Sequence, residues 1–110
     1  MAIKANIVIE QGTDFSATID VTDSIGDPFD LTNYTAASQM RKNYAASTAT
    51  TFTCTDNNSL GQITLSLNNT QSEALEPGRY LYDVEITSTG GEVIRVVEGI
   101  ATVTPGITRI

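Results

Sequence analysis

The sequence predicts an all-β domain in which two antiparallel sheets, with about seven strands in total, pack face to face as a sandwich. Apolar and polar side chains alternate with a period of two along several segments, which is typical of half-buried strands. Turn residues separate these segments at intervals of about eight to twelve residues, as in β-sandwiches. The chain has 110 residues, 40% hydrophobic and 17% charged, which suits one domain with one core and excludes a disordered chain.

The first half of the chain alternates clearly at its start and less clearly towards its middle. Strands are expected over residues 2–10, 15–22 and 34–42. Residues 44–55 are rich in Ala, Ser and Thr, whose helix and strand propensities leave the local preference undecided. For this segment we expect a loop to about Ala49 and then a short strand through Phe52 and Cys54.

The second half of the chain carries the only helical signal. Strands are expected over residues 62–68, 79–87 and 92–104. Between the first two of them, Asn69 or Thr70 can cap a single helical turn that runs to Leu75. In the last strand the alternation changes parity near Glu98 and Gly99, which predicts a β-bulge there.

Composition excludes several classes of function. Thirteen acidic residues against six basic ones give a net charge of −7, which disfavours binding to nucleic acid or to anionic membranes. There is no histidine, so histidine-based triads and histidine metal sites are excluded. Cys54 is the single cysteine, and its position in a strand pattern favours a small core side chain over a nucleophile. The first residues form no apolar run of signal-peptide length, so we expect synthesis in a cytoplasm.

Two groups of carboxylates are candidates for a site. Asp20, Asp23, Asp27 and Asp30 fall within eleven residues, and oxygen ligands of this kind can hold Ca²⁺. An EF-hand loop would need a ligand where Ile25 stands, so Asp23, Asp27 and Asp30 remain weak candidates and we expect no bound metal or cofactor.

The second group is Asp83 and Glu85, which share one face of a strand about 7 Å apart. A glycosidase needs its two acids across a cleft, and nothing in the pattern predicts one. We therefore expect these two side chains to lie on a solvated face, and we expect no enzymatic activity.

The segment from Leu75 to Tyr82 carries the most specific local motif. Its Gly78-x-Tyr80-x-Tyr82 is similar to the Gly-x-Tyr-x-Cys with which immunoglobulin-type domains enter strand F, after a short helical turn. In such a corner a tyrosine hydroxyl hydrogen-bonds back to the backbone, here beside Pro77 and Gly78. The resemblance implies an immunoglobulin-like sandwich over residues 1–104, followed by a tail over 105–110. The alternative is that both tyrosines are ordinary half-buried strand residues.

Several segments, spread over most of the chain, resemble small domains found in virion proteins of tailed bacteriophages, including marine cyanophages. These segments are residues 12–15, 26–32, 39–41, 61–67, 77–84, 96–100 and 103–109. The resemblance implies a non-enzymatic structural or assembly protein of the virion, in capsid decoration, neck, tail or baseplate. It also implies protein–protein contacts with other virion proteins and with further copies of the chain. The alternative function is a free-standing adhesion module that binds carbohydrate or Ca²⁺.

Two segments are candidates for contact with a partner. The tail contains Ile107, Arg109 and Ile110, and apolar residues at a chain end can dock into a groove, although such ends are often frayed. Removal of residues 106–110 is therefore expected to abolish assembly without changing thermal stability. Thr50 and Thr51 lie in the uncharged segment, which we expect to form an open strand edge that pairs with a neighbour.

Overall fold

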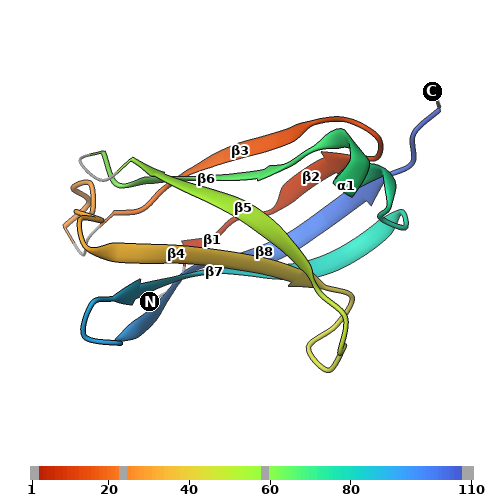
Figure 1. The fold of residues 1–110 in the computed structure, drawn as a ribbon. Helices are drawn as coiled ribbons and strands as arrows, with labels where there is room; N and C mark the ends of the chain where they lie inside the picture. The colour runs from red at the N-terminus through yellow and green to blue at the C-terminus, as the bar shows by residue number, and fades with distance from the viewer. Residues whose placement is uncertain (1–2, 23–24, 58–59, 108–110) are drawn as a thin grey trace.

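The computed structural model describes residues 3–22, 25–57 and 60–107 and confirms an all-β fold (Figure 1). The described residues form eight strands and one helix, with these bounds: β1 Ile3–Lys4, β2 Ile7–Glu10, β3 Phe15–Asp20, β4 Tyr34–Arg41, β5 Thr50–Asn57, β6 Gln62–Leu67, α1 Asn69–Glu73, β7 Gly78–Ser88 and β8 Val93–Thr104. None of the described residues forms a helix that is long and apolar enough to cross a membrane.

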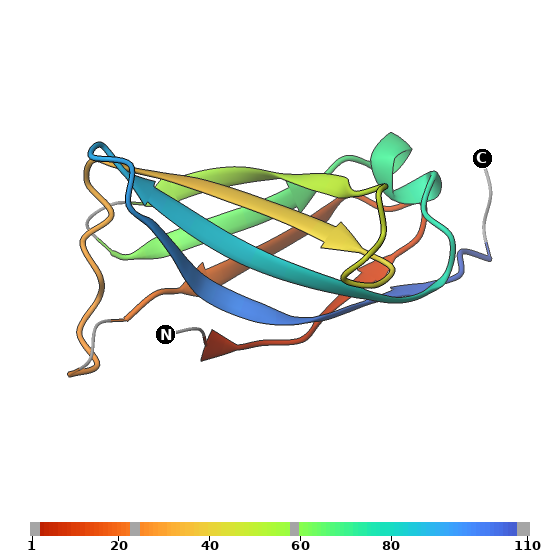
Figure 2. The same ribbon diagram turned by 90° about the horizontal axis from the view of Figure 1, so that it is seen from below.

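The strands form one ladder that curls over itself. Its order is β1-β8-β7-β4-β5-β6-β3, and β2 also pairs with β8. β5 links the two parts of this ladder, because Thr50–Phe52 pair with β4 whereas Thr53–Asn57 pair with β6. As a result β3 and β6 lie on one side of the core, and β4, β7 and β8 lie on the other (Figures 1 and 2).

The core is built from the inward residues of both parts of the ladder. Along β6 and β7 every second side chain is buried, as the period-two pattern predicts. The buried apolar residues are Ile9, Val21, Leu31, Met40, Phe52, Ile63, Leu65, Leu67, Leu75, Tyr80, Tyr82, Val84, Ile86, Val96, Val97, Ala101 and Val103.

The N-terminal strands correct the expectation of wholly antiparallel pairing. Both β1 and β2 run parallel to β8, while the other strand pairs are antiparallel. The turn at Gly12, whose φ is 84°, carries the chain from β2 in one part of the ladder to β3 in the other. Because these consecutive strands lie in different parts, β2 pairs with the edge of β8 instead of forming a hairpin with β3.

The expected first strand, residues 2–10, is divided into β1 and β2 because the regular pairing with β8 is interrupted at Ala5 and Asn6, although the Ala5 amide still donates to the Glu98 carbonyl oxygen at 3.0 Å. There the side-chain oxygen Oδ1 of Asn6 accepts a hydrogen bond from the Ile100 amide at 3.1 Å. Gly99 allows this close approach, since a Cβ at that position would overlap the carbonyl oxygen of Ala5 and lie 2.8 Å from its carbonyl carbon.

The β-bulge lies earlier in β8 than the sequence predicts. Val84 pairs with Val97 and Glu85 pairs with Arg95, which leaves Val96 as the extra residue, so the prediction of a bulge at Glu98 and Gly99 is wrong. Val96 and Val97 are consequently both buried. The inward positions of β8 are even-numbered up to Val96 and odd-numbered from Val97 onwards. The change of parity that the sequence shows near Glu98 is a consequence of this earlier bulge.

The helical turn is present, but its cap differs from the prediction. The N-cap is Asn68, not Asn69 or Thr70. Oδ1 of Asn68 accepts a hydrogen bond from the Gln71 amide at 2.8 Å, and Oε1 of Gln71 accepts one from the Asn68 amide at 2.9 Å. This reciprocal pair is a capping box, which satisfies two amides that a helix N-terminus leaves without partners.

Candidate functional site

The outer faces of β4, β7 and β8 enclose an open hollow of about 530 Å³. Strand register arranges its side chains in rows across the sheet. One row consists of Lys4, Glu98, Asp83 and Gln39. The neighbouring row consists of Ile100, Leu81 and Arg41. A row of charged and amide groups therefore lies beside a row with two aliphatic side chains.

Ion pairs hold Arg95 at one side of the hollow. Its Nε lies 3.1 Å from Oδ2 of Asp83, and its Nη1 lies 3.7 Å from Oε2 of Glu98. In an unbroken strand, residues 95 and 98 would point to opposite faces. The extra residue Val96 brings both to the outer face, in the way that bulges re-aim side chains.

Hydrogen bonds hold Arg41 at the opposite side. Its Nη1 donates to the carbonyl oxygen of Ala46 at 2.7 Å, and its Nη2 donates to Oε1 of Gln39 at 3.1 Å. The first bond joins β4 to the hairpin loop that follows it. Tyr44 lies in this loop at the rim of the hollow, and 88% of it is exposed.

The charges in the hollow balance. Three basic residues, Lys4, Arg41 and Arg95, line it with three acidic ones, Asp83, Glu85 and Glu98. These charges cancel, so the net charge of −7 lies on the rest of the chain.

The hollow includes Asp83 and Glu85, the two carboxylates that the sequence places on one strand face. They lie on one partly exposed face of β7, as predicted, and this face forms part of the open hollow. Strand alternation identifies the outward side chains of β7. It does not identify the strands beside them or the loop that forms the rim, so the hollow was missed.

The two tyrosines of the Gly78-x-Tyr80-x-Tyr82 motif bond to different parts of the backbone. The Tyr80 hydroxyl donates to the carbonyl oxygen of Glu76 at 2.8 Å, four residues upstream and next to the exposed Pro77. The Tyr82 hydroxyl donates to the carbonyl oxygen of Ala5. Burial raises the pKa of both phenols. The two side chains thus connect strands and loops, and neither lies free for chemistry.

The predicted metal candidates are not gathered by the part of the chain that the structure describes. Asp23 lies outside the described residues, and Asp27 and Asp30 are exposed. Oδ1 of Asp30 accepts a hydrogen bond from the Thr32 amide at 3.0 Å. Hydrogen bonds from the side chain and then from the backbone of Thr32 lower the pKa of the Asp30 carboxyl. Among the described residues there is no group of three or more His, Cys, Asp or Glu that could hold a metal ion.

The predicted partner residues have different positions. Ile107 is 96% exposed, whereas Arg109 and Ile110 lie outside the described residues. Thr50 pairs with Met40 and Thr51 with Gln39 in the half of β5 that pairs with β4, whereas the pairing with β6 begins at Thr53. Each half of β5 thus pairs with one strand only, and the expectation that Thr50 and Thr51 offer an open edge to a neighbour stays a prediction.

Cys54 has the environment of a core side chain. The thiol is partly buried, and burial, followed by the nearby Asp56 carboxylate, raises its pKa. A raised pKa keeps the thiol protonated at neutral pH, and the protonated form is a poor nucleophile.

Comparison with known proteins gives no family. No family model matches the chain, and no curated protein matches it. Among solved structures, the Listeria monocytogenes internalin-like protein lmo2027 is similar with a TM-score of 0.47 and 18% sequence identity, over 94% of this chain and 28% of that protein. The chain thus spans little more than a quarter of the length of that structure.

Proposed function

We propose that the chain is an immunoglobulin-like β-sandwich module that acts by binding and not by catalysis, as a structural or assembly protein of a tailed-phage virion. The observation that carries the binding role is the hollow on β4, β7 and β8. Its arginines are held by ion pairs or hydrogen bonds before any ligand arrives, so it is a preorganised recognition surface.

The strand order supports the immunoglobulin-like assignment. In that fold one sheet contains strands C, F and G and the other contains strands B, E and D. Here β4, β7 and β8 are neighbours, as C, F and G are, and β3, β6 and the second half of β5 are neighbours, as B, E and D are. The helical turn α1 precedes β7, and the Tyr80 hydroxyl bonds to the Glu76 carbonyl where a tyrosine corner has its bond.

The virion role rests on the resemblance of the seven sequence segments to tailed-phage virion domains. Mass spectrometry of purified particles of the virus that carries the gene tests it. We expect peptides of this chain in the particle fraction at a ratio to the major capsid protein that stays constant through repeated gradients. Loss of the chain during purification, with the other structural proteins retained, would contradict the proposal.

The tail, in which Ile107 is 96% exposed, is the proposed point of attachment. The Gly106 amide donates to Oε1 of Gln11 at 3.0 Å, so a truncation that leaves the fold intact starts at residue 107, not at 106. We expect a chain without residues 107–110 to keep its melting temperature and to be absent from particles. Incorporation of the shortened chain at the normal level would show that attachment lies elsewhere.

A further inference from the structure

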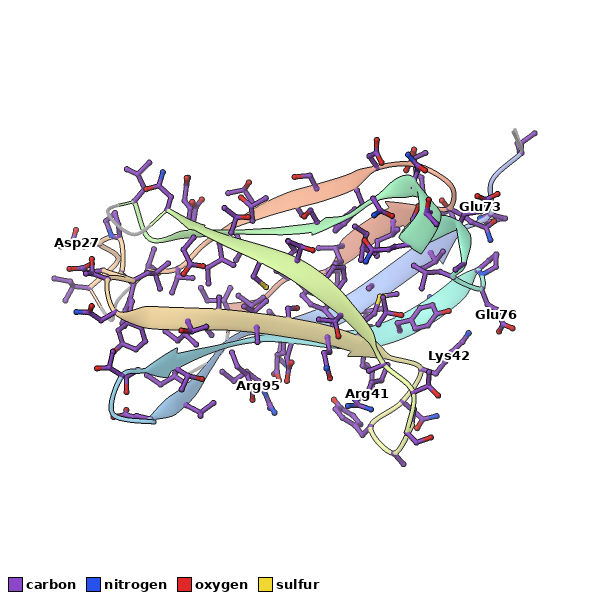
Figure 3. All side chains as sticks on the ribbon, in the orientation of Figure 1. Asp27, Arg41, Lys42, Glu73, Glu76 and Arg95 are labelled. Atoms are coloured by element: carbon purple, nitrogen blue, oxygen red, sulfur yellow. The ribbon has the colours of Figure 1, made fainter. Side chains whose placement is uncertain are left out.

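We propose that the hollow on β4, β7 and β8 binds a neutral oligosaccharide without a metal ion. This inference goes beyond a protein–protein role and does not depend on it. The C-terminal segment leaves β8 at the upper right of Figure 1, whereas Arg41 and Arg95 project from the underside of the sheet (Figure 3). The hollow and the tail thus lie at different places on the molecule, so binding at the hollow and attachment through the tail can be tested separately.

The charge balance of the hollow selects a neutral ligand. An anion would meet the three carboxylates, and a cation would meet the three basic groups. The guanidinium of Arg95 is already paired with Asp83, and that of Arg41 already donates to Ala46 and Gln39. A ligand with many hydroxyl groups can both donate to the carboxylates and accept from the basic and amide groups, and it brings no charge to be desolvated.

Two charged groups are available for such hydroxyls. In the described part of the chain, Lys4 and Glu85 have neither a hydrogen bond from their side chains nor an ion pair. Lys4 supplies three donors at one side of the hollow, and Glu85 supplies two acceptor oxygens from β7. The network around Arg95 lies next to Glu85, because Glu85 and Arg95 are paired in register.

The apolar groups fit the other faces of a sugar ring. Leu81 and Ile100 are partly exposed and lie side by side in the second row. Tyr44 is 88% exposed at the rim, which leaves its ring free to pack against the C–H groups of a sugar. The volume of about 530 Å³ is within the range of small-molecule sites and suits a short oligosaccharide.

The first experiment is an array of neutral and acidic oligosaccharides, probed with the full chain carrying a C-terminal biotin on streptavidin, since avidity makes weak sugar binding visible. The tag is placed far from Lys4. We expect neutral oligosaccharides to bind, acidic ones to bind less, and a chelator to have no effect. The proposal would be overturned if no neutral glycan bound, if acidic glycans bound better than neutral ones, or if the chelator abolished binding.

The second experiment locates the site by titrating ¹⁵N-labelled chain with the best neutral oligosaccharide of the array. We expect shift changes at amides of β4, β7 and β8, and an affinity at least about tenfold weaker in Tyr44→Ala. Tyr44→Phe keeps the ring and should bind within about threefold of the natural chain. Val93→Ala, an exposed apolar change outside the hollow, is the matched control.

Charge is tested with Glu85→Gln, which keeps a hydrogen-bonding side chain and removes one negative charge. A neutral ligand should lose less than about tenfold in affinity, because one acceptor oxygen remains. The proposal would be overturned by shift changes on another face or by an unchanged affinity in Tyr44→Ala. It would also be overturned by shifts at β4, β7 and β8 that depend on protein concentration alone. The last result would identify the hollow as a contact between copies. Presence of the chain in particles stays a separate measurement, so either proposal can fail alone.

Discussion

Two tyrosine hydroxyls stabilise two junctions that lie far apart in the sequence. Tyr80 closes the short corner between α1 and β7 through the carbonyl of Glu76. Tyr82 holds the point where β1 and β2 meet, because its partner Ala5 lies between these two strands. The two residues are 77 positions apart in the chain. Each ring fills part of the core, and each hydroxyl donates to a backbone carbonyl of a residue outside the strands.

Tyr80→Phe should lower the free energy of unfolding by about 1 kcal/mol, since the carbonyl of Glu76 loses its donor while the ring stays in the core. Urea unfolding followed by circular dichroism measures the change. Tyr44→Phe removes the same atom from an exposed residue and should leave the unfolding midpoint unchanged. Equal effects of the two substitutions would mean that the corner bond contributes nothing.

Gly99→Ala should destabilise the fold by at least about 2 kcal/mol, because the new methyl group overlaps the backbone of Ala5 and pushes β1 away from β8. Thermal unfolding checks the loss, and amide exchange should be fastest in β1 and β2. Gly90→Ala is the control, since its Cβ meets no atom closer than 3.8 Å. A Gly99→Ala chain as stable as the control would show that the N-terminal strands are displaced at no cost.

At the scale of elements, α1 is joined to the turn between β2 and β3. Ser72 is fully buried in α1, where its hydroxyl accepts a hydrogen bond from the Gly12 amide at 3.1 Å and donates to the carbonyl oxygen of Thr13 at 2.6 Å. One side chain therefore supplies partners to both backbone groups of a turn that carries the chain between the two parts of the ladder.

Ser72→Ala should cost about 1 kcal/mol of stability, since the Gly12 amide and the Thr13 carbonyl lose their part-buried hydrogen bonds to the Ser72 hydroxyl. Denaturant unfolding gives the magnitude, and faster exchange of the Gly12 amide locates the cause. Ser47→Ala, in the exposed loop after β4, is the matched control and should be neutral. An unchanged Gly12 exchange rate would indicate that solvent already satisfies the turn.

At the scale of the whole molecule, stability should fall at alkaline pH. Burial raises the pKa of Tyr80 and Tyr82 above the ordinary value of 10, so both phenols hold their protons more tightly in the folded state than in the unfolded one. Their contribution is fully present below pH 10 and is lost as the pH rises through the folded-state pKa.

Unfolding midpoints in urea measured from about pH 8 to pH 11, on both sides of the ordinary phenol pKa, test this expectation. The midpoint should decline above pH 10 in the natural chain and decline less in Tyr82→Phe, which has lost one of the two titrating groups. If the unfolding midpoint declined equally in the two chains, the loss of stability at alkaline pH would come from other groups.

Much of the fold follows from local patterns. Phe15–Asp20 and Gln62–Leu67 alternate cleanly, and both are strands because a half-buried strand requires that period. The helical turn before β7 was also predictable from its cap residues and from Pro77. The position of its cap was missed by one or two residues, since Asn68, Asn69 and Thr70 are all suitable N-caps and only the bond to Gln71 distinguishes them.

Other features depend on which strands become neighbours. The parallel pairing of β1 and β2 with β8, and the division of β5 between β4 and β6, join segments that are distant in the sequence. The bulge at Val96 was predicted too far along β8. A change of parity along one strand reveals that an extra residue is present, but only the pairing register with β7 shows which residue it is.

The amino-acid sequence alone established the class of fold, most strand positions and the motif at Tyr80, because alternation and turn chemistry act between residues that are close in the chain. The hollow was established only by the folded arrangement. Lys4, Gln39, Asp83 and Glu98 are adjacent because four strands from the whole length of the chain lie in one register, and that register is a property of the packed sheets.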